Sequence, residues 1–185
     1  MKKFDIIISG VGGQGILLLS NIIGQACIEE KVPVKGAEIH GMAQRGGSVE
    51  AHIRIGGIYG PKIPEGKADL LLSLEPLEAA RYSCYLKKDG IAIVNNFKIP
   101  LLGEDYSVDE MIEIVKKKTK NIYVENFTEI AIKLGSVRIL NILMLGFASK
   151  FIPLKKESLK KAIKKLVKPQ FIELNLSAFS HFSRG

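Results

Sequence analysis

A glycine-rich turn near the start of the sequence is the first stretch that could do chemistry. The segment SGVGGQGILLLSNIIG, residues 9–24, follows a short apolar run and carries Gly10, Gly12 and Gly15. Glycines at this spacing between a strand and a helix allow a tight bend, and the N–H groups of the helix start favour an anion. Three interpretations stay open: a site for NAD or FAD, a site for another anionic or phosphorylated ligand, and a purely structural turn.

An acidic residue further along bears on the dinucleotide interpretation. Such sites bind the ribose with a carboxylate about 20 residues beyond the glycines, and Glu38 lies 23 residues after Gly15. Gly13 and Gln14 weigh against a dinucleotide, because they add a second flexible glycine and a bulky amide to the turn. That amide can hydrogen-bond a partner that approaches from outside.

A polar loop follows Glu38. Residues 39–49, IHGMAQRGGSV, place an imidazole, an amide and a guanidinium among glycines. Open α/β sheets bind ligands at the carboxyl ends of their strands, so we expect this loop and the glycine turn to converge there. The structural alternative is that Arg45 only pairs with Glu38. The candidate site residues of the loop are His40, Gln44, Arg45, Gly46 and Gly47.

Apolar periodicity predicts alternating strands and helices. The predicted strands cover residues 4–9, 34–39, 48–55, 68–74, 90–96 and 121–126, and the predicted helices cover residues 16–30, 76–86, 108–118 and several segments from 128 on. Residues 56–57 predict a turn that pairs 48–55 with 58–59 as an inserted antiparallel hairpin, and residues 88–90 predict another turn. This order predicts one domain, residues 1–185: an α/β three-layer, Rossmann-like fold with a mostly parallel sheet, a β-hairpin insertion and a helical C-terminal portion from about residue 128.

Charge and cysteine usage limit the functional classes. The formal charge is +8, and residues 150–185 hold nine Lys or Arg against Glu157 and Glu173. These lysines lie mostly opposite the apolar stripe of a predicted helix, so we expect a solvated face, with an anionic partner (nucleic acid, membrane surface or acidic protein) as the alternative. Cys27 and Cys84 form no C-x-x-C motif, which is typical of buried thiols in a reducing cytosol. Asp5 interrupts the apolar start, so we expect a cytoplasmic protein without an export signal.

Several other residues carry weaker expectations. Residues 137–152, VRILNILMLGFASKFI, are apolar nearly all round but too short to span a bilayer. They must be buried in the core or against another subunit. His52 is expected at the surface or an interface, because it lies on the face of its strand opposite Val49. His181 is expected in solvent or on a partner. Glu75 is expected as an acid at a helix start, with a position in the crevice as the alternative.

Four segments together resemble a known family. SGVGGQGILLLSNIIG, AEIHGMAQRGGSVEAHIRIG, ADLLLSLEPLEAARY and LGSVRILNILMLG occur in this order and resemble the small subunit of the 2-oxoacid:ferredoxin oxidoreductases, called gamma in the pyruvate and oxoglutarate enzymes and beta in the indolepyruvate enzyme. The segment EIHGMAQRGG resembles the indolepyruvate type most closely. The resemblance implies an assembly that decarboxylates a 2-oxoacid on thiamine diphosphate, passes electrons through iron–sulfur clusters to ferredoxin, and transfers the acyl group to coenzyme A.

This chain can carry only part of that chemistry. Two cysteines are too few for a cubane cluster, which needs four thiolates. The pairs Asp89-Gly90 and Asn95-Asn96 resemble pieces of the family's thiamine motif, but one short strand separates them. The resemblance therefore implies a larger partner subunit that holds the thiamine diphosphate and the clusters, so that this chain is not active alone and binds no cofactor firmly.

The resemblance also suggests roles for the site residues. The turn at 12–15 and the loop at 40–47 are expected to face the large subunit over its thiamine site and to form part of the acyl and coenzyme A pocket. Arg45 would bind a substrate carboxylate or a coenzyme A phosphate. Glu38 would orient Arg45 or His40, and Gln14 and Gln44 would hydrogen-bond the ligand or the partner; His40 as a general base is the less favoured alternative.

Two other functions stay as alternatives. One is a stand-alone enzyme that uses NAD(P) or FAD through the glycine turn. The other is a nucleic-acid or anion-binding module that uses the basic C-terminal helix. The paired motifs favour the oxidoreductase subunit, without nucleic acid or membrane, and the isolated chain is expected to pair as a homodimer through surface that the partner would cover.

Overall fold

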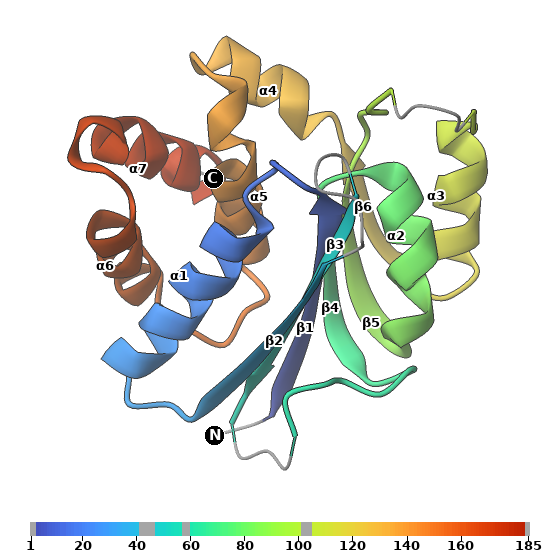
Figure 1. The fold of residues 1–185 in the computed structure, drawn as a ribbon, viewed down its shortest axis with the longest axis horizontal. Coiled ribbons are helices and arrows are strands. Elements are labelled where there is room, and N and C mark those ends of the chain that lie inside the picture. Colours follow the sequence, from blue (N-terminus) through green and yellow to red (C-terminus); the bar gives the residue numbers. More distant parts are fainter. Residues whose placement is uncertain (1–2, 41–46, 57–59, 101–104, 184–185) are drawn as a thin grey trace.

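A six-stranded sheet lies between two helical layers in the computed structural model (Figure 1), which describes residues 3–40, 47–56, 60–100 and 105–183. The strand order is β2-β3-β1-β4-β5-β6. β1, β4, β5 and β6 are parallel, whereas β3 is antiparallel to both of its neighbours. The strands are β1 (Phe4–Val11), β2 (Val34–His40), β3 (Ser48–Ile55), β4 (Ala68–Ser73), β5 (Leu86–Asn95) and β6 (Asn121–Glu125).

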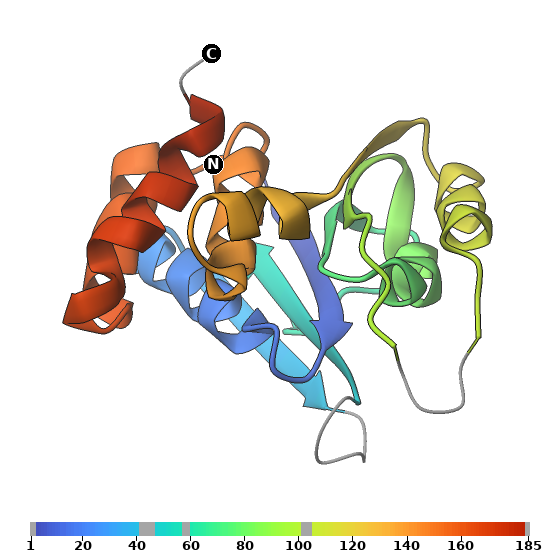
Figure 2. The ribbon, with the colours of Figure 1, turned by 90° about the horizontal axis from the view of Figure 1, so that it is seen from above.

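Seven α-helices of the described ranges cover the two faces of the sheet, and the view from above shows their arrangement (Figure 2). One apolar core joins the sheet to α1 (Ile16–Glu29), α4 (Phe127–Lys133), α5 (Leu140–Ala148), α6 (Lys156–Leu166) and α7 (Ile172–Ser180). A smaller core lies on the other face under α2 (Pro76–Tyr82) and α3 (Val108–Lys116). Short 3-10 turns cover Ser83–Tyr85, Val137–Ile139, Pro169–Phe171 and His181–Ser183. The predicted three-layer α/β fold is confirmed.

The apolar segment around α5 is covered by its own chain. Nearly every residue of α5 is buried, between α1, α4 and α7. At Gly146 the helix backbones of α5 and α7 touch, because a Cβ built there would lie 2.2 Å from the carbonyl oxygen of Phe179. Helix α5 itself is therefore core, and its hydrophobicity gives no evidence for a partner.

Two predicted turns differ from the structure. β3 forms its antiparallel hairpin with the preceding strand β2, and β1 pairs along its other edge; residues 58–59, the expected partner, lie outside the described residues. Residues 88–90, the expected turn, belong to β5 instead. The pairing of β4 with β5 jumps from Ala68↔Leu86 to Leu70↔Ile91, so a bulge absorbs the extra residues.

The prediction that His52 lies at the surface or an interface is wrong, because the chain after β3 folds back over this face of the sheet. His52 is fully buried. Its Nδ1 accepts a hydrogen bond from the Ile63 amide at 3.1 Å, and the Tyr85 ring packs edge-on against the imidazole. Glu50 Oε1 lies 3.5 Å from Nε2. Burial lowers the pKa of His52, and Glu50 opposes that shift.

The basic C-terminal stretch forms the expected amphipathic helix. In α6, Leu159, Ala162 and Ile163 are buried, whereas Lys161 and Lys164 are exposed. This is the arrangement of a solvated face. Within the described ranges no helix is long and apolar enough to cross a membrane.

Candidate functional site

The glycine turn joins the carboxyl end of β1 to the start of α1. The Gln14 amide donates to the Val11 carbonyl at 3.1 Å and closes the reversal. Gly13 and Gly15 have φ of 101° and 82°, the left-handed region that costs other residues about 1–2 kcal/mol. Gly15 is in this conformation as the N-cap of α1. The tight bend predicted from the glycine spacing is therefore present.

The side chain of Gln14 folds back into the turn. Its Oε1 accepts from the Val11 amide at 2.7 Å, and its Nε2 donates to the Leu74 carbonyl at 3.0 Å. A Cβ on Gly10 would lie only 2.5 Å from Oε1, so glycine at that position makes room for the amide. The expectation that this amide reaches a partner outside the turn is thus corrected: its hydrogen bonds tie the end of β1 to the residue after β4.

Asn141 fixes the turn from the other side, a role not predicted from the sequence. Its side chain is 3% exposed, and Nδ2 donates to the Gly15 carbonyl at 3.2 Å across 126 residues of sequence. A Cβ on Gly15 would lie 2.3 Å from that Nδ2. The available signal was a single amide inside an otherwise apolar helix, because a buried amide needs a hydrogen-bond partner.

The turn and the polar loop meet, as predicted. Gly12 donates its amide to the Gly47 carbonyl at 2.9 Å, and β3 begins at Ser48 opposite Val11. Gln44, Arg45 and Gly46 lie outside the described residues, as does the side chain of His40. The structure therefore places the loop's base beside the turn and leaves the assigned roles of those four residues as proposals.

Buried polar groups hold the exit of the loop against α2. The Ser48 hydroxyl donates to Glu78 Oε2 and lies 2.8 Å from the Tyr82 hydroxyl. Glu78 is 1% exposed and accepts from Arg81 Nη1 at 2.8 Å. Because the carboxylate has both a hydroxyl and a guanidinium donor, it stays hydrogen-bonded in its buried position.

Asn95 ties together three elements near the turn. Its Nδ2 donates to the Leu74 carbonyl at 3.1 Å and to Thr128 Oγ1 at 2.9 Å. The Leu74 carbonyl therefore accepts from both Gln14 and Asn95. Asn95 thus has a structural role at the ends of β4 and β5, in agreement with the sequence argument against a thiamine motif here.

Glu75 is the N-cap of α2, as the helix-start interpretation predicted. Its Oε2 accepts from the Glu78 amide at 3.0 Å, and the Tyr106 hydroxyl donates to Oε1. The side chain is fully buried. Burial raises the pKa of Glu75 to about 6, although the hydrogen bond from the Glu78 amide lowers it. Folding therefore favours the protonated form of this carboxyl.

We expect the Glu75→Gln substitution to change how stability depends on pH. The folded-state pKa of Glu75 is above the ordinary value of 4.5, so the folded state binds more proton between these values and wild-type stability falls as pH rises from about 4.5 to 6. The wild type loses about 1–2 kcal/mol of unfolding free energy over this range. The glutamine amide of the variant does not titrate, so the variant should lack this loss. Urea unfolding of both chains at pH 4 and pH 7 measures the difference. An equal pH dependence in both would contradict the assignment.

Two hollows flank the glycine turn. The larger, about 450 Å³, lies between the turn, the residues after β5 and the start of α5, and includes Phe97, Val137 and Arg138. The smaller, about 300 Å³, lies between the turn and Val49. Phe97 and Val137 are 42% and 51% exposed, and Leu17 beside the smaller hollow is 41% exposed. The turn is thus surrounded by apolar side chains that water contacts in the isolated chain.

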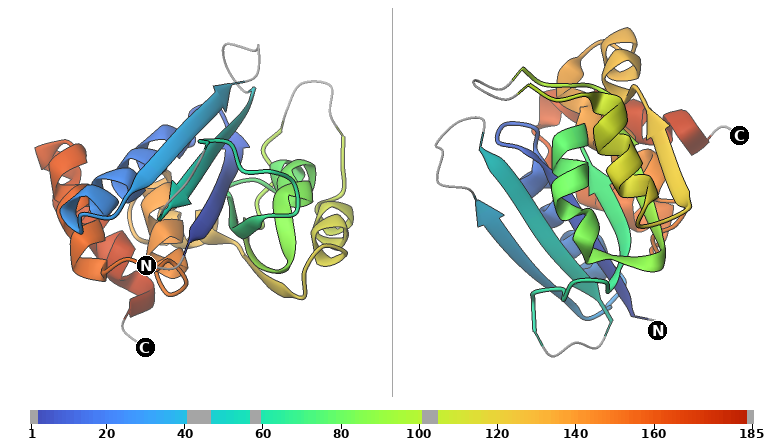
Figure 3. Two further views of the ribbon diagram at one scale, coloured as in Figure 1. Left: turned by 90° about the horizontal axis from the view of Figure 1, so that it is seen from below. Right: turned by 90° about the vertical axis from the view of Figure 1, so that its right-hand side faces the viewer.

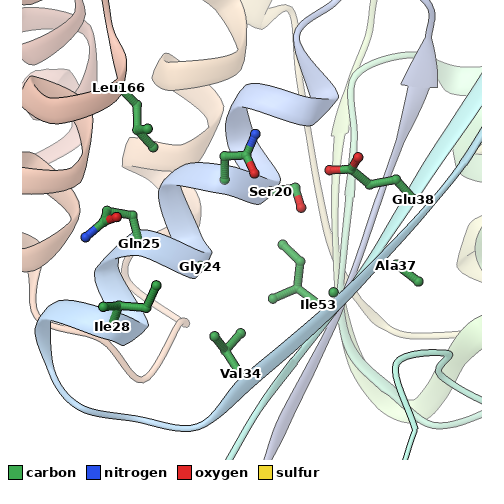
Figure 4. Close-up of a pocket in the computed structure, with 11 residues that line it drawn as sticks. Ser20, Gly24, Gln25, Ile28, Val34, Ala37, Glu38, Ile53 and Leu166 are labelled. Carbon is green, nitrogen blue, oxygen red and sulfur yellow. The ribbon is translucent and has the colours of Figure 1, made fainter.

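Glu38 does not converge with the turn. In a dinucleotide fold the second strand adjoins the first, but here antiparallel β3 separates β2 from β1, so that β2, which carries Glu38, lies two strand spacings, about 10 Å, from β1. Glu38 instead lines a groove between α1 and β2 (Figure 4). The Gly12 amide, which would face a pyrophosphate, is bonded to Gly47. This geometry argues against NAD or FAD in the turn.

Comparison with known proteins shows the family of the chain. Residues 5–181 match the model of the pyruvate ferredoxin/flavodoxin oxidoreductase family, and the chain belongs to that family. It is 41% identical to the indolepyruvate oxidoreductase subunit IorB of Archaeoglobus fulgidus over 95% of this chain and 92% of the relative. The chain is therefore a small subunit of the 2-oxoacid:ferredoxin oxidoreductase type, as the resemblance predicted.

Solved structures give the same fold. The gamma subunit of a keto/oxoacid ferredoxin oxidoreductase from Geobacter sulfurreducens aligns with a TM-score of 0.72 and 26% identity, over 96% of this chain and 94% of that chain. A 2-oxoglutarate:ferredoxin oxidoreductase from Magnetococcus marinus, solved with 2-oxoglutarate, coenzyme A and succinyl-CoA, aligns with a TM-score of 0.80 over 99% of this chain and 31% of its own longer chain. At 19% identity the second match shows likeness of fold alone.

Proposed function

We propose that this chain forms one wall of the acyl and coenzyme A pocket in a thiamine-dependent 2-oxoacid:ferredoxin oxidoreductase. A larger subunit would hold the thiamine diphosphate and the clusters. The observation that carries the proposal is the glycine turn, which Gln14, Asn141 and Gly47 fix in place between two hollows with apolar rims. The similarity to an indolepyruvate enzyme favours indolepyruvate or another arylpyruvate as substrate, with a pyruvate-like acid as the alternative.

The outward side of the turn suits an anion or a partner backbone. The Gly13 and Gly15 amides donate no hydrogen bond to any acceptor in the described ranges, and they lie at the N-terminal end of α1, where the helix dipole favours negative charge. A substrate carboxylate, a coenzyme A phosphate or a carbonyl of the large subunit could accept from them. The inward hydrogen bonds keep this edge in place before any ligand binds.

An iron–sulfur cluster does not fit the residues of this chain. A cubane cluster needs four thiolates, and the sequence has two cysteines. Burial raises the pKa of Cys27 to about 12, which disfavours its thiolate. In the described ranges no group of three or more His, Cys, Asp or Glu side chains could hold a metal ion. We therefore assign the clusters to the partner subunit.

The apolar rim supports a partner on this side of the chain. Leu17, Phe97 and Val137 are each more than 40% exposed around the same turn, and exposed apolar side chains that gather at one site are typical of protein interfaces. A partner seated there would close the hollows and exclude water from the acyl transfer. Closure of this kind strengthens the electrostatic interactions of a substrate anion.

The Arg45→Ala substitution tests the role of the loop. Loss of a charge-assisted hydrogen bond to a substrate carboxylate or phosphate, worth about 1.5–3 kcal/mol, should lower kcat/KM by about ten- to a hundredfold while the complex still assembles. Steady-state reduction of ferredoxin by the reconstituted complex measures it, with Lys161→Ala on the exposed face of α6 as the matched control. An unchanged rate would refute the role of Arg45.

A further inference from the structure

A second groove lies apart from the glycine turn, between α1 and β2 (Figure 4). It measures about 430 Å³. Helix residues from Ser20 to Ile28 form one wall, and strand residues from Val34 to Glu38 form the other. These spans correspond to about 12–13 Å along each element. The groove therefore has the length of four or five residues of extended chain.

The strand that borders the groove is the outer edge of the sheet. β2 pairs only with β3 among the described strands, and Figure 3 shows it at the open side of the sheet next to α1. Ala37 pairs with His52, so its side chain lies on the face of the sheet away from α1. Ala37 therefore lines the groove with its backbone atoms. The groove thus exposes an unpaired strand edge, the template to which an extended peptide adds.

Two glycines line the groove, and no contact or backbone conformation in the described part of this chain requires glycine at either position. Gly24 is in the middle of α1, where glycine is less favourable than alanine. A Cβ built on Gly24 meets nothing within 4 Å, and one on Gly36 meets only the His52 carbonyl at 3.7 Å, an ordinary contact. Neither has a positive φ. Close approach of another molecule would explain glycine at both positions.

The polar groups of the groove indicate the chemistry of its occupant. Glu38 is exposed, and its carboxylate points across the groove toward Ser20 (Figure 4); it forms no ion pair with the described residues. At the other end Ile28 is 63% exposed. A segment with a Lys or Arg at one end and an apolar side chain at the other would complement both ends.

We propose that the groove binds an extended segment of the large partner subunit, which adds as a strand to the edge of β2. Small side chains of that segment pass over Gly24 and Gly36, a basic side chain pairs with Glu38, and an apolar side chain covers Ile28. This inference rests on the proposed function in one respect, that the chain works in a complex. It places a contact on a surface away from the turn.

Substitutions at Gly24 test the groove. Because a Cβ has space there, Gly24→Ala should raise the melting temperature of the isolated chain by about 2–4 °C while weakening binding of the large subunit. Gly24→Leu fills the groove and should weaken that binding at least about tenfold. Titration calorimetry or co-purification with the large subunit measures it. The matched control is Ser177→Ala, an exposed position in α7, which should leave binding unchanged.

Hydrogen exchange gives a second measurement on the wild-type complex. In the register of β2 with β3, the amides of Val34, Gly36 and Glu38 face the outer edge. These three amides should exchange at least about tenfold more slowly in the complex than in the isolated chain, because strand addition gives them hydrogen-bond acceptors. Unchanged exchange at these amides, or wild-type affinity of a folded Gly24→Leu chain, would overturn the groove proposal. The Arg45 result tests the proposed function separately. If Arg45→Ala lowers the rate while the Gly24→Leu chain binds the large subunit with wild-type affinity, the proposed function stands and only the groove proposal is wrong.

Discussion

Replacing Gly15 with alanine is expected to lower the free energy of unfolding of the isolated chain by about 2–4 kcal/mol and to reduce turnover of the complex at least about tenfold. The backbone at Gly15 has φ of 82°, which strains any side chain. The new Cβ would also lie 2.3 Å from Asn141 Nδ2. Either the turn or the asparagine must move, so the hydrogen bond to the Gly15 carbonyl is lost. Urea unfolding and ferredoxin reduction measure the two effects.

Gly13→Ala is the matched control for that prediction. Gly13 also has a positive φ, 101°, but a Cβ there meets nothing within 4 Å, so only the backbone strain remains. The double variant Gly15→Ala with Asn141→Ala should recover part of the stability that Gly15→Ala loses, because the overlap is removed. Equal losses for Gly13→Ala and Gly15→Ala would contradict the proposed contact between the turn and α5.

Gly146→Ala is expected to destabilise the core by about 1–3 kcal/mol or more. Its Cβ would lie 2.2 Å from the Phe179 carbonyl oxygen and 2.9 Å from the carbonyl carbon. These are backbone atoms of α7, so no rotamer change relieves the overlap and the two helices must separate. Since α5 is buried almost throughout, separation disturbs contacts on every side of it.

Thermal unfolding of the isolated chain checks the Gly146 prediction. A loss of this size lowers the melting temperature by about 2–4 °C per kcal/mol in a protein of this length. Gly24→Ala is the internal comparison, because it is also a helical glycine but faces open space and should act in the opposite direction. A melting temperature unchanged by Gly146→Ala would show that α5 and α7 are not packed backbone to backbone.

The elements of the fold could be predicted from the sequence because local periodicity determines them. The strand at Phe4–Val11 and the helix at Ile16–Glu29 are close to their predicted bounds, and the predicted amphipathic helix is present as α6. Strand order could not be predicted in the same way. The antiparallel insertion of β3 between β2 and β1 depends on long-range pairing, and it alone moves Glu38 away from the turn.

The contacts that support the site are also long-range. Gln14 bonds Leu74, and Asn141 bonds Gly15, so neither partner is visible in a local pattern. His52 alternates correctly with its apolar neighbours in β3, and yet it is buried because residues near Ile63 cover it. Alternation shows which face a side chain takes and does not show what covers that face. The glycine turn could be predicted because its requirement, a positive φ, is local.

The most direct test of the account is to assay the reduction of ferredoxin with a 2-oxoacid and coenzyme A in three samples: this chain, the large subunit, and the two combined. We expect no turnover from this chain alone, little or none from the large subunit, and full turnover from the combination. Turnover by this chain alone, or tight binding of NAD or FAD to it, would contradict the claim that it shapes a catalytic centre held by another subunit.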